Sequence, residues 1–388
     1  MGTSMGYCRK SGDGGLMKFD QLPTPCYVID EGKLRDNLSV LKKLQDDTGC
    51  KVLLAQKAFS TFDQYPLISK YLSGTTASSL YEARLSAEEM GKENHIFAPA
   101  YKDQEFDEIA SLCGHIVFNS FAQLEKYHNR CKSASIGIRI NPEYSTQDHA
   151  IYDPCAPGSR LGVTAENFRP DLLGGVEGIH FHTLCEQNAD ALEATIVAVE
   201  EKFGSWLYQM KWINIGGGHH ITRSDYDVDL LARCVRKLQD QYQVQVYLEP
   251  GEAIALNAGY LYTEVLDIVK NGITTLILDT SAACHMPDVL EMPFRPPLLH
   301  SGQAGEKEFT YRLSSHTCLA GDIIGDYSFD CEIRIGDRLC FLNTAIYSMV
   351  KNNTFNGIQL PGIAAISEDG DYRLIKSFDY HDFKNRLS

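Results

Sequence analysis

The sequence predicts a (β/α)8 TIM barrel followed by a mainly antiparallel β domain. Apolar runs of strand length alternate with longer amphipathic stretches from about Leu38 to Tyr260, and this rhythm is typical of β/α units. After about Gly259 the strand-like runs continue without helical stretches between them, which indicates antiparallel pairing. The 388 residues leave room for a barrel of about 250 residues and a second domain. An open doubly wound sheet explains the length and repetition less well.

Four segments are expected along the chain. They are a leader at residues 1–16, an N-terminal strand segment at 17–34 that joins the β domain, a (β/α)8 barrel at 35–260 and the C-terminal β domain at 261–388. The leader lacks the apolar core of a signal peptide, and Met17 is a candidate alternative start. It is left out of the fold prediction.

Within the barrel segment, short runs rich in apolar and β-branched residues predict strands at 52–54, 95–98, 116–118, 136–140, 176–181, 212–215 and 244–248. The stretches between them are amphipathic and long enough to cross back over a parallel sheet, which predicts helices at 79–90, 120–131, 189–203 and 227–242.

In the C-terminal segment, strands are expected at 262–269, 274–279, 309–313, 338–341 and 372–377. The proline-rich stretch 286–297 is expected to be an ordered loop. Residues 25–30 resemble a strand, and we expect them to pair with this β domain instead of the barrel.

Composition restricts the function classes. No apolar stretch approaches the roughly 20 residues of a membrane helix, so we expect no membrane partner. A net charge of -15 would repel phosphate backbones, which argues against nucleic acid and suits a cationic small substrate. The twelve cysteines include no C-x-x-C pair, so reduced thiols in the cytoplasm are expected in place of a zinc ribbon or disulfide scaffold.

Lys57 lies two residues after the apolar run 52–55, where a barrel strand delivers side chains to the functional face. Desolvation lowers the pKa of an amine and makes it nucleophilic, so Lys57 is a candidate Schiff-base lysine. The alternative is a solvated lysine at a strand end.

Two histidines in Ile179-His180-Phe181-His182 share one face of a strand by alternation. They could bind a metal, with Cys185 as a third ligand, or place one imidazole against an aromatic cofactor. A purely structural pair is the third reading.

Two further motifs follow strands. Gly216, Gly217 and Gly218 allow a tight turn that aims N–H groups at an anion such as a phosphate, or form an ordinary turn. Glu249, held by the next residue, Pro250, could keep a pyridine nitrogen protonated, or simply cap a strand. An amine, a phosphate cradle, a stacking ring and a carboxylate together meet the needs of pyridoxal 5'-phosphate.

The chain resembles the alanine-racemase-like pyridoxal phosphate decarboxylases of the ornithine and diaminopimelate group. The resemblance covers nearly the whole chain after the leader and is carried by QKAF, HFH, GGG, EPGE, HTCLAGD and TAIYSMVKNNTFNG. Within that group, EPGEA and CHMPDVLE (284–291) are similar to the carboxynorspermidine and carboxyspermidine decarboxylases. This implies decarboxylation of a carboxylated polyamine in spermidine or norspermidine biosynthesis.

The resemblance also implies site residues. Lys57 would hold the cofactor covalently, His182 would stack on its ring and Glu249 would pair with its nitrogen, while Gly216–Gly218 and Tyr347 would lie at the phosphate. Cys318 would reach the neighbouring subunit's cofactor and return a proton after carbon dioxide leaves. The enzyme would then be a homodimer with shared active sites.

The chain departs from its better-known relatives at two places. Glu252 stands where those enzymes generally carry arginine, and with Asp288 it could bind the amines of a long cation. Leu319 replaces the aspartate after the catalytic cysteine, a role that Asp322 could take over.

Three other readings stay open from the sequence. A diaminopimelate or other basic amino-acid decarboxylase would share the fold. A metal-dependent barrel hydrolase would use His180 and His182. A catalytically silent regulator would keep the fold, although the presence of Lys57 and Cys318 argues against it.

Overall fold

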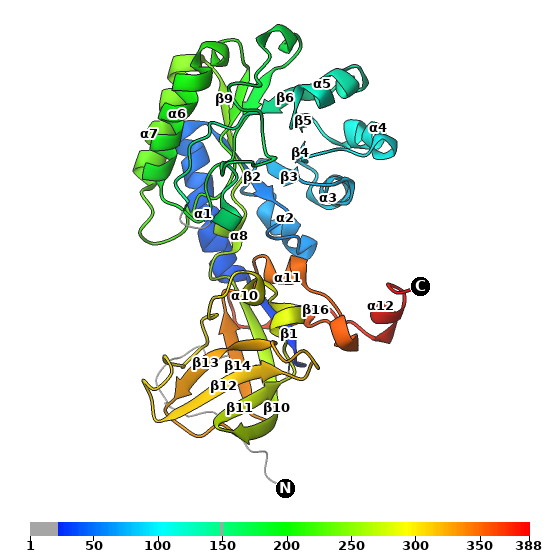
Figure 1. Cartoon of the computed structure of the whole chain (residues 1–388), viewed down its shortest axis with the longest axis vertical. Coiled ribbons are helices and arrows are strands. Elements are labelled where there is room, and N and C mark those ends of the chain that lie inside the picture. Colours follow the sequence, from blue (N-terminus) through cyan, green and yellow to red (C-terminus); the bar gives the residue numbers. More distant parts are fainter. Residues whose placement is uncertain (1–21, 148–149) are drawn as a thin grey trace. The chain divides into compact units, whose positions relative to one another are not determined.

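The computed structural model describes residues 22–147 and 150–388. The expected leader at 1–16 and the first part of the expected strand segment lie outside these residues. The chain divides into two compact units, one made of residues 35–254 and one of residues 22–34 with 255–388. Figure 1 shows the elements of each unit.

The unit 35–254 contains a closed barrel of parallel strands in the order β2-β3-β4-β5-β6-β7-β8-β9. The strands are β2 (Lys51–Ala55), β3 (Gly74–Ala77), β4 (Glu93–Phe97), β5 (His115–Phe118), β6 (Ser135–Arg139), β7 (Gly178–His180), β8 (Trp212–Asn214) and β9 (Gln245–Leu248). Closure comes from β9 pairing with β2, with Lys51 opposite Tyr247. This confirms the predicted barrel and seven of its strands.

Helices lie outside the ring of strands (Figure 1). They are α1 (Glu31–Thr48), α2 (Tyr65–Ile68), α3 (Leu80–Leu85), α4 (Asp103–Leu112), α5 (Phe121–Tyr127), α6 (Ala189–Leu207), α7 (Val228–Tyr242) and α8 (Glu252–Ala255). In α6, Leu192, Ile196, Val199 and Phe203 recur at helical spacing and are buried, so one apolar stripe packs inward. Ser79 caps α3 and Ser120 caps α5 through their side chains.

The other unit is built on an eight-stranded mixed sheet in the order β13-β12-β11-β10-β1-β15-β16, with β14 also paired to β10. Its strands are β1 (Cys26–Asp30), β10 (Gly259–Asn271), β11 (Ile273–Leu278), β12 (Phe309–Ser315), β13 (Ile323–Phe329), β14 (Arg338–Leu342), β15 (Gly362–Ile366) and β16 (Tyr372–Lys376). The strand expected at 25–30 is present as β1, antiparallel to β10 and parallel to β15.

Short helices lie between or after the strands of this sheet along the chain. They are α9 (Ala282–His285), α10 (Asp288–Glu291), α11 (Ser348–Lys351) and α12 (Tyr380–Lys384). The stretch 286–297, expected to be a loop, therefore contains α10, whose amides at Val289 and Leu290 bond back to Met286 and Pro287. A cluster around Tyr27, Leu261, Leu313 and Phe341 forms the buried core.

Candidate active site

The carboxyl ends of the barrel strands bring the predicted barrel residues to one face. Lys57 follows β2, His182 follows β7, Gly216–Gly218 follow β8 and Glu249 follows β9. Parallel strands in a closed barrel end on the same side, so residues far apart in sequence meet there.

Lys57 lies in the turn after β2, and its side chain is exposed at the carboxyl end of the barrel. Desolvation lowers the pKa of its ammonium group, and the nearby positive charge of Arg139 lowers it further, whereas Glu249 and Glu82 act in the opposite direction. A lowered pKa increases the fraction of neutral amine, which is the nucleophilic form. The environment therefore suits attack on an aldehyde.

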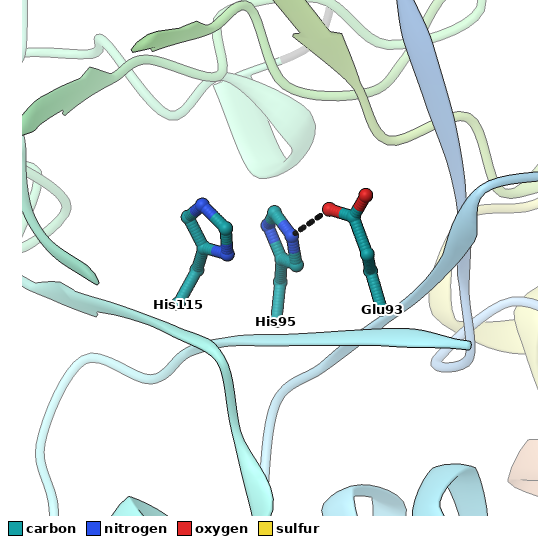
Figure 2. A group of neighbouring side chains, drawn as sticks. All are labelled: Glu93, His95 and His115. Atoms are coloured by element: carbon teal, nitrogen blue, oxygen red, sulfur yellow. Dashed lines mark hydrogen bonds and ion pairs between the residues drawn. The ribbon is translucent and has the colours of Figure 1, made fainter. Parts of the chain in front are cut away.

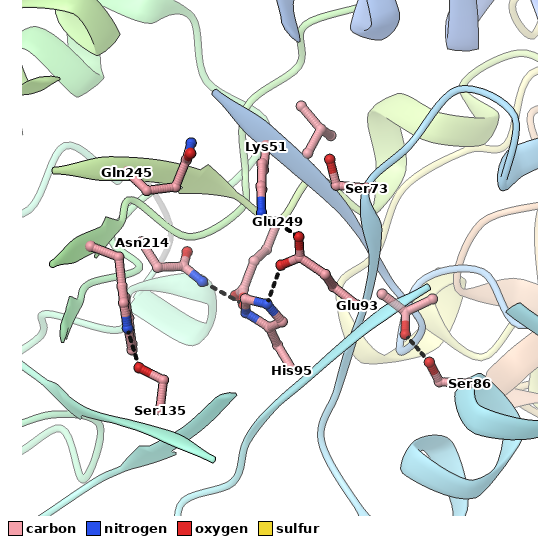
Figure 3. A network of polar contacts seen from close by, with 12 residues as sticks. Lys51, Ser73, Ser86, Glu93, His95, Ser135, Asn214, Gln245 and Glu249 are labelled. Atoms are coloured by element: carbon pink, nitrogen blue, oxygen red, sulfur yellow. Dashed lines mark hydrogen bonds and ion pairs between the residues drawn. The ribbon is translucent and has the colours of Figure 1, made fainter. Parts of the chain in front are cut away.

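Glu249 is a mostly buried, ionised carboxylate, with 11% of its side chain exposed. Burial alone would raise its pKa, but His180 and Asn214 outweigh that effect and bring the pKa to about 2. Asn214 Nδ2 donates to Oε1 at 2.7 Å, and His180 Nε2 lies 3.2 Å from Oε2. Figure 3 shows the bond from Asn214. Because a carboxylate only accepts, His180 Nε2 is the donor.

His182 presents a neutral imidazole. Its Nδ1 accepts a hydrogen bond from the Gly217 amide at 2.8 Å, so the ring proton lies on Nε2. Desolvation, followed by the charge of Lys57, holds its pKa well below the usual value. A neutral ring anchored at one edge is suited to lie against an aromatic cofactor. His180 and His182 thus have different partners, and neither belongs to the two groups of three potential metal ligands present within residues 22–147 and 150–388.

The glycine loop is packed too closely for side chains. A Cβ at Gly217 would lie 2.3 Å from the Glu249 carbonyl oxygen, and one at Gly218 would lie 2.0 Å from that of Leu184. Gly216 donates its amide to Asn214 Oδ1 and Gly217 donates to His182. Two of the three amides are therefore engaged within the protein, and the phosphate role of the loop stays a prediction.

Arg139, at the end of β6, was not among the predicted residues. Its Nη2 donates to the His182 carbonyl oxygen at 3.2 Å, and its guanidinium lies 4.5 Å from the centre of the Phe97 ring. Its Nε is buried and has no hydrogen-bond partner among the residues that the structure describes, and burial lowers its pKa to about 10. The signal in the sequence was a single charge inside the apolar run 136–140.

The unit 255–388 holds three further predicted residues, Cys318, Tyr347 and Asp288. Cys318 is exposed, and its amide donates to Asn356 Oδ1 at 2.8 Å. Tyr347 precedes α11 with a φ of 56°, a left-handed conformation that is uncommon outside glycine. Asp288 forms an ion pair with Lys351, so a substrate amine would compete with that lysine for its carboxylate.

Asp322 is fixed as a structural acceptor. The hydroxyls of Ser281, Ser315 and Thr317 each lie 2.6 Å from its Oδ2. Burial raises its pKa, but these donors outweigh the burial and lower it overall. The carboxylate therefore ties together the loops around it, including Thr317 just before Cys318, and its role beside Cys318 stays a prediction.

A second polar group occupies the opposite end of the barrel, where the strands begin. Glu93 accepts from His95 Nε2 at 3.1 Å and pairs with Lys51, and the rings of His95 and His115 stack 3.9 Å apart at 16° (Figures 2 and 3). Stacked imidazoles direct their nitrogen lone pairs along nearly parallel planes, which do not converge on one ion. Because the Lys51 ammonium group already pairs with Glu93, these side chains are better explained as polar groups that satisfy one another at the amino-terminal end of the barrel than as a metal site.

The chain was compared with known proteins. The family model "pyridoxal-dependent decarboxylase, C-terminal sheet domain" matches residues 26–345. The chain belongs to the pyridoxal-dependent decarboxylases. Carboxynorspermidine/carboxyspermidine decarboxylase from Campylobacter jejuni is 44% identical over 95% of this chain and 100% of its own length. Carboxyaminopropylagmatine decarboxylase from Synechocystis is 41% identical over 95% and 97%.

Solved structures agree with the fold. The crystal structure of Campylobacter jejuni carboxynorspermidine decarboxylase complexed with norspermidine superposes with a TM-score of 0.89 at 43% identity, and the match covers 94% of this chain and all of that one. Helicobacter pylori diaminopimelate decarboxylase has a TM-score of 0.79 at 18% identity and shows the fold alone.

Pyridoxal phosphate, the cofactor of this family, fits the barrel residues. Lys57 offers an amine of lowered pKa, Glu249 a carboxylate that stays charged, and Arg139 a buried Nε donor that lacks a partner. No helix within residues 22–147 and 150–388 is long and apolar enough to cross a bilayer.

Proposed function

We propose that this chain decarboxylates carboxynorspermidine and carboxyspermidine to norspermidine and spermidine in polyamine biosynthesis. The observation that carries the proposal is the full-length match to the Campylobacter jejuni enzyme of that name, whose structure was solved with norspermidine. Glu252, in place of the arginine usual in ornithine and diaminopimelate decarboxylases, supports a cationic substrate over one with a second carboxylate.

The site residues are proposed to act as follows. Bound pyridoxal phosphate supplies the electron sink for the pair left when carbon dioxide departs. Lys57 Nζ would hold the cofactor covalently, Glu249 would pair with its ring nitrogen and His182 would lie against its ring. Gly216, Gly217, Gly218 and Tyr347 would hold the phosphate, and Glu252 and Asp288 would bind substrate amines. Cys318 Sγ delivers a proton to the substrate α-carbon.

Carbon dioxide release tests this function directly. The panel consists of carboxynorspermidine, carboxyspermidine, carboxyaminopropylagmatine, diaminopimelate, ornithine and arginine. We expect the first two to be turned over with the highest kcat/KM and within about 200-fold of each other, since one methylene is worth about 1–3 kcal/mol. Highest kcat/KM on diaminopimelate would overturn the proposal. Highest kcat/KM on carboxyaminopropylagmatine would favour a second candidate function, which the Synechocystis relative supports.

Lys57→Ala should abolish both the absorbance of the lysine-bound cofactor and turnover, because no other amine would hold the cofactor in place. Lys51→Ala is the matched control, since Lys51 begins the same strand at the opposite end of the barrel. A Lys57→Ala protein with an unchanged cofactor spectrum would contradict the assignment.

We further propose a homodimer in which Cys318 acts at the partner's cofactor. Mixing two inactive variants, Lys57→Ala and Cys318→Ala, should then restore about a quarter of wild-type activity, because half of randomly exchanged dimers carry one intact site of two. No recovery after verified subunit exchange would show that Cys318 acts within its own chain.

Free thiols throughout the described residues suit a cytoplasmic enzyme.

A further inference from the structure

Three ionisable side chains gather beside the proposed active site, and two of them were not predicted. Glu186 follows β7, His220 follows the glycine loop after β8, and Glu252 begins α8 after β9. One ligand atom of each lies within 4.8 Å of the others. The electrostatic surroundings of Cys185 include Glu186, Glu252 and Lys57, which places the group near the amine that holds the cofactor.

Within the part of the chain that the structure describes, neither carboxylate forms an ion pair with a lysine or an arginine, and Glu252 lies beside His220. Glu186 is exposed, yet partial desolvation raises its pKa and the negative charge of Glu252 raises it further, while His220 and Arg223 act in the opposite direction. Like charges this close repel each other, and a cation bound to both would relieve the repulsion. Arg223 directs its guanidinium to other acceptors, because its Nε pairs with Asp225 and its Nη1 donates to the Glu186 backbone carbonyl oxygen at 3.3 Å.

The position of the ring proton on His220 indicates which kind of cation the two carboxylates can bind. Its side chain is 7% exposed, and Arg223 Nη1 lies 3.3 Å from its Nδ1. A guanidinium only donates, so Nδ1 accepts and the ring proton lies on Nε2. Nε2 points at Glu252 Oε2 from 3.2 Å but makes no hydrogen bond of good geometry. A protonated Nε2 cannot ligate a metal, whereas a ligand that brings its own N–H donors can use both carboxylates.

The backbone directs Glu186 toward this place. Glu186 has a φ of 54°, a strained conformation for a residue with a side chain. The Gln187 amide bonds to the Gly218 carbonyl oxygen at 3.0 Å and secures the segment to the glycine loop. The cofactor loop and the carboxylate pair are therefore parts of one framework.

We infer that Glu186 and Glu252 together form the subsite for a protonated amine of the substrate, with His220, whose Nε2 lies 3.2 Å from Glu252 Oε2, as the residue that positions Glu252 when the amine binds. This inference rests on the proposed function, because a carboxylated polyamine supplies the ammonium. It adds Glu186, which no sequence motif pointed to, as a determinant of specificity.

The test compares Glu186→Gln and Glu252→Gln with the control Glu201→Gln, an exposed glutamate on α6. Calorimetry on the holoenzyme measures the Kd of norspermidine and of N-propyl-1,3-diaminopropane, which lacks one terminal amine. Each subsite variant should weaken norspermidine binding about tenfold through loss of a charge-assisted hydrogen bond, weaken the diamine less, and leave the cofactor spectrum unchanged. A norspermidine Kd equal to that of Glu201→Gln would overturn the inference.

A further pair of variants tests whether a side-chain donor at position 220 is what positions Glu252. His220→Gln keeps a side-chain donor and should retain most of the norspermidine affinity, whereas His220→Leu should raise KM with little change in kcat. Equal effects of the two variants would contradict the positioning role. Turnover of carboxynorspermidine by the wild-type enzyme is measured separately, so failure of the proposed function is distinguishable from failure of the subsite.

Discussion

Glu249 shows how a buried carboxylate can keep its charge. Taking an ionised group out of water is costly unless hydrogen-bond donors replace the lost hydration. Asn214 supplies one donor and His180 the other, and together they hold the pKa at about 2. The same strand-end residue is therefore charged and oriented throughout the working pH range of an enzyme.

Replacing that charge tests its importance. Glu249→Gln keeps the shape of the side chain but cannot stabilise a protonated ring nitrogen, so we expect kcat to fall about 100-fold or more. The absorbance of the lysine-bound cofactor should persist, which separates lost electrostatics from lost binding. A kcat within a few-fold of wild type would show that the charge is not used.

At the scale of elements, the turn after β8 requires glycine because neighbouring backbone segments lie very close to it. Gly217 faces the Glu249 carbonyl, and its amide holds His182. One turn therefore couples the ends of β7, β8 and β9, and a displacement of the turn would reach both the stacking ring and the carboxylate.

Gly217→Ala should displace this turn, because its Cβ would lie 2.3 Å from a backbone oxygen. We expect a weaker cofactor Kd, by roughly tenfold or more, and a loss of about 1–3 kcal/mol in the free energy of unfolding. Gly174→Ala is the matched control, since nothing lies within 4 Å of its added Cβ. Equal behaviour of the two variants in cofactor titration and urea unfolding would refute this account.

At the scale of the whole molecule, buried neutral histidines link stability to pH. Desolvation is the main cause that lowers the pKa of His115 from 6.5 to about 3, and of His219 and His285 from 6.5 to about 4. In the unfolded chain these rings take up protons near pH 6.5, whereas in the folded protein they do so only in stronger acid. Between these values the unfolded state binds more protons.

Above about pH 6.5 the free energy of unfolding should therefore keep its full value. Below that pH each of the three rings should lower it by about 1.4 kcal/mol per pH unit, so the combined loss by about pH 4.5 should reach several kcal/mol. Glu249 and Glu93, with pKa values of about 2, lose their contribution only below about pH 4.5 and do not explain a loss above it. Urea unfolding at pH 7.5, 6 and 4.5 measures the slope. A constant unfolding free energy over that range would contradict it.

Most barrel strands were predictable because each is a compact apolar run. β3 (Gly74–Ala77) was missed because Gly-Thr-Thr-Ala is short and contains no large apolar residue. In the second unit, β13 was missed because Gly325 and Asp326 interrupt its pattern. The parallel pairs β1–β15 and β11–β12 were also unforeseen, since strand direction depends on chain connections that local patterns do not record.

By itself, the sequence determined the alternating barrel pattern and the chemistry that follows individual strands, because Lys57, His182 and Glu249 each stand at or just beyond the end of an apolar run. Only the tertiary structure placed Arg139 in the electrostatic surroundings of Lys57 and Glu186 next to Glu252. The physical reason is barrel closure, which brings strand ends from distant parts of the chain to one face, where burial and neighbouring charge set each group's protonation state.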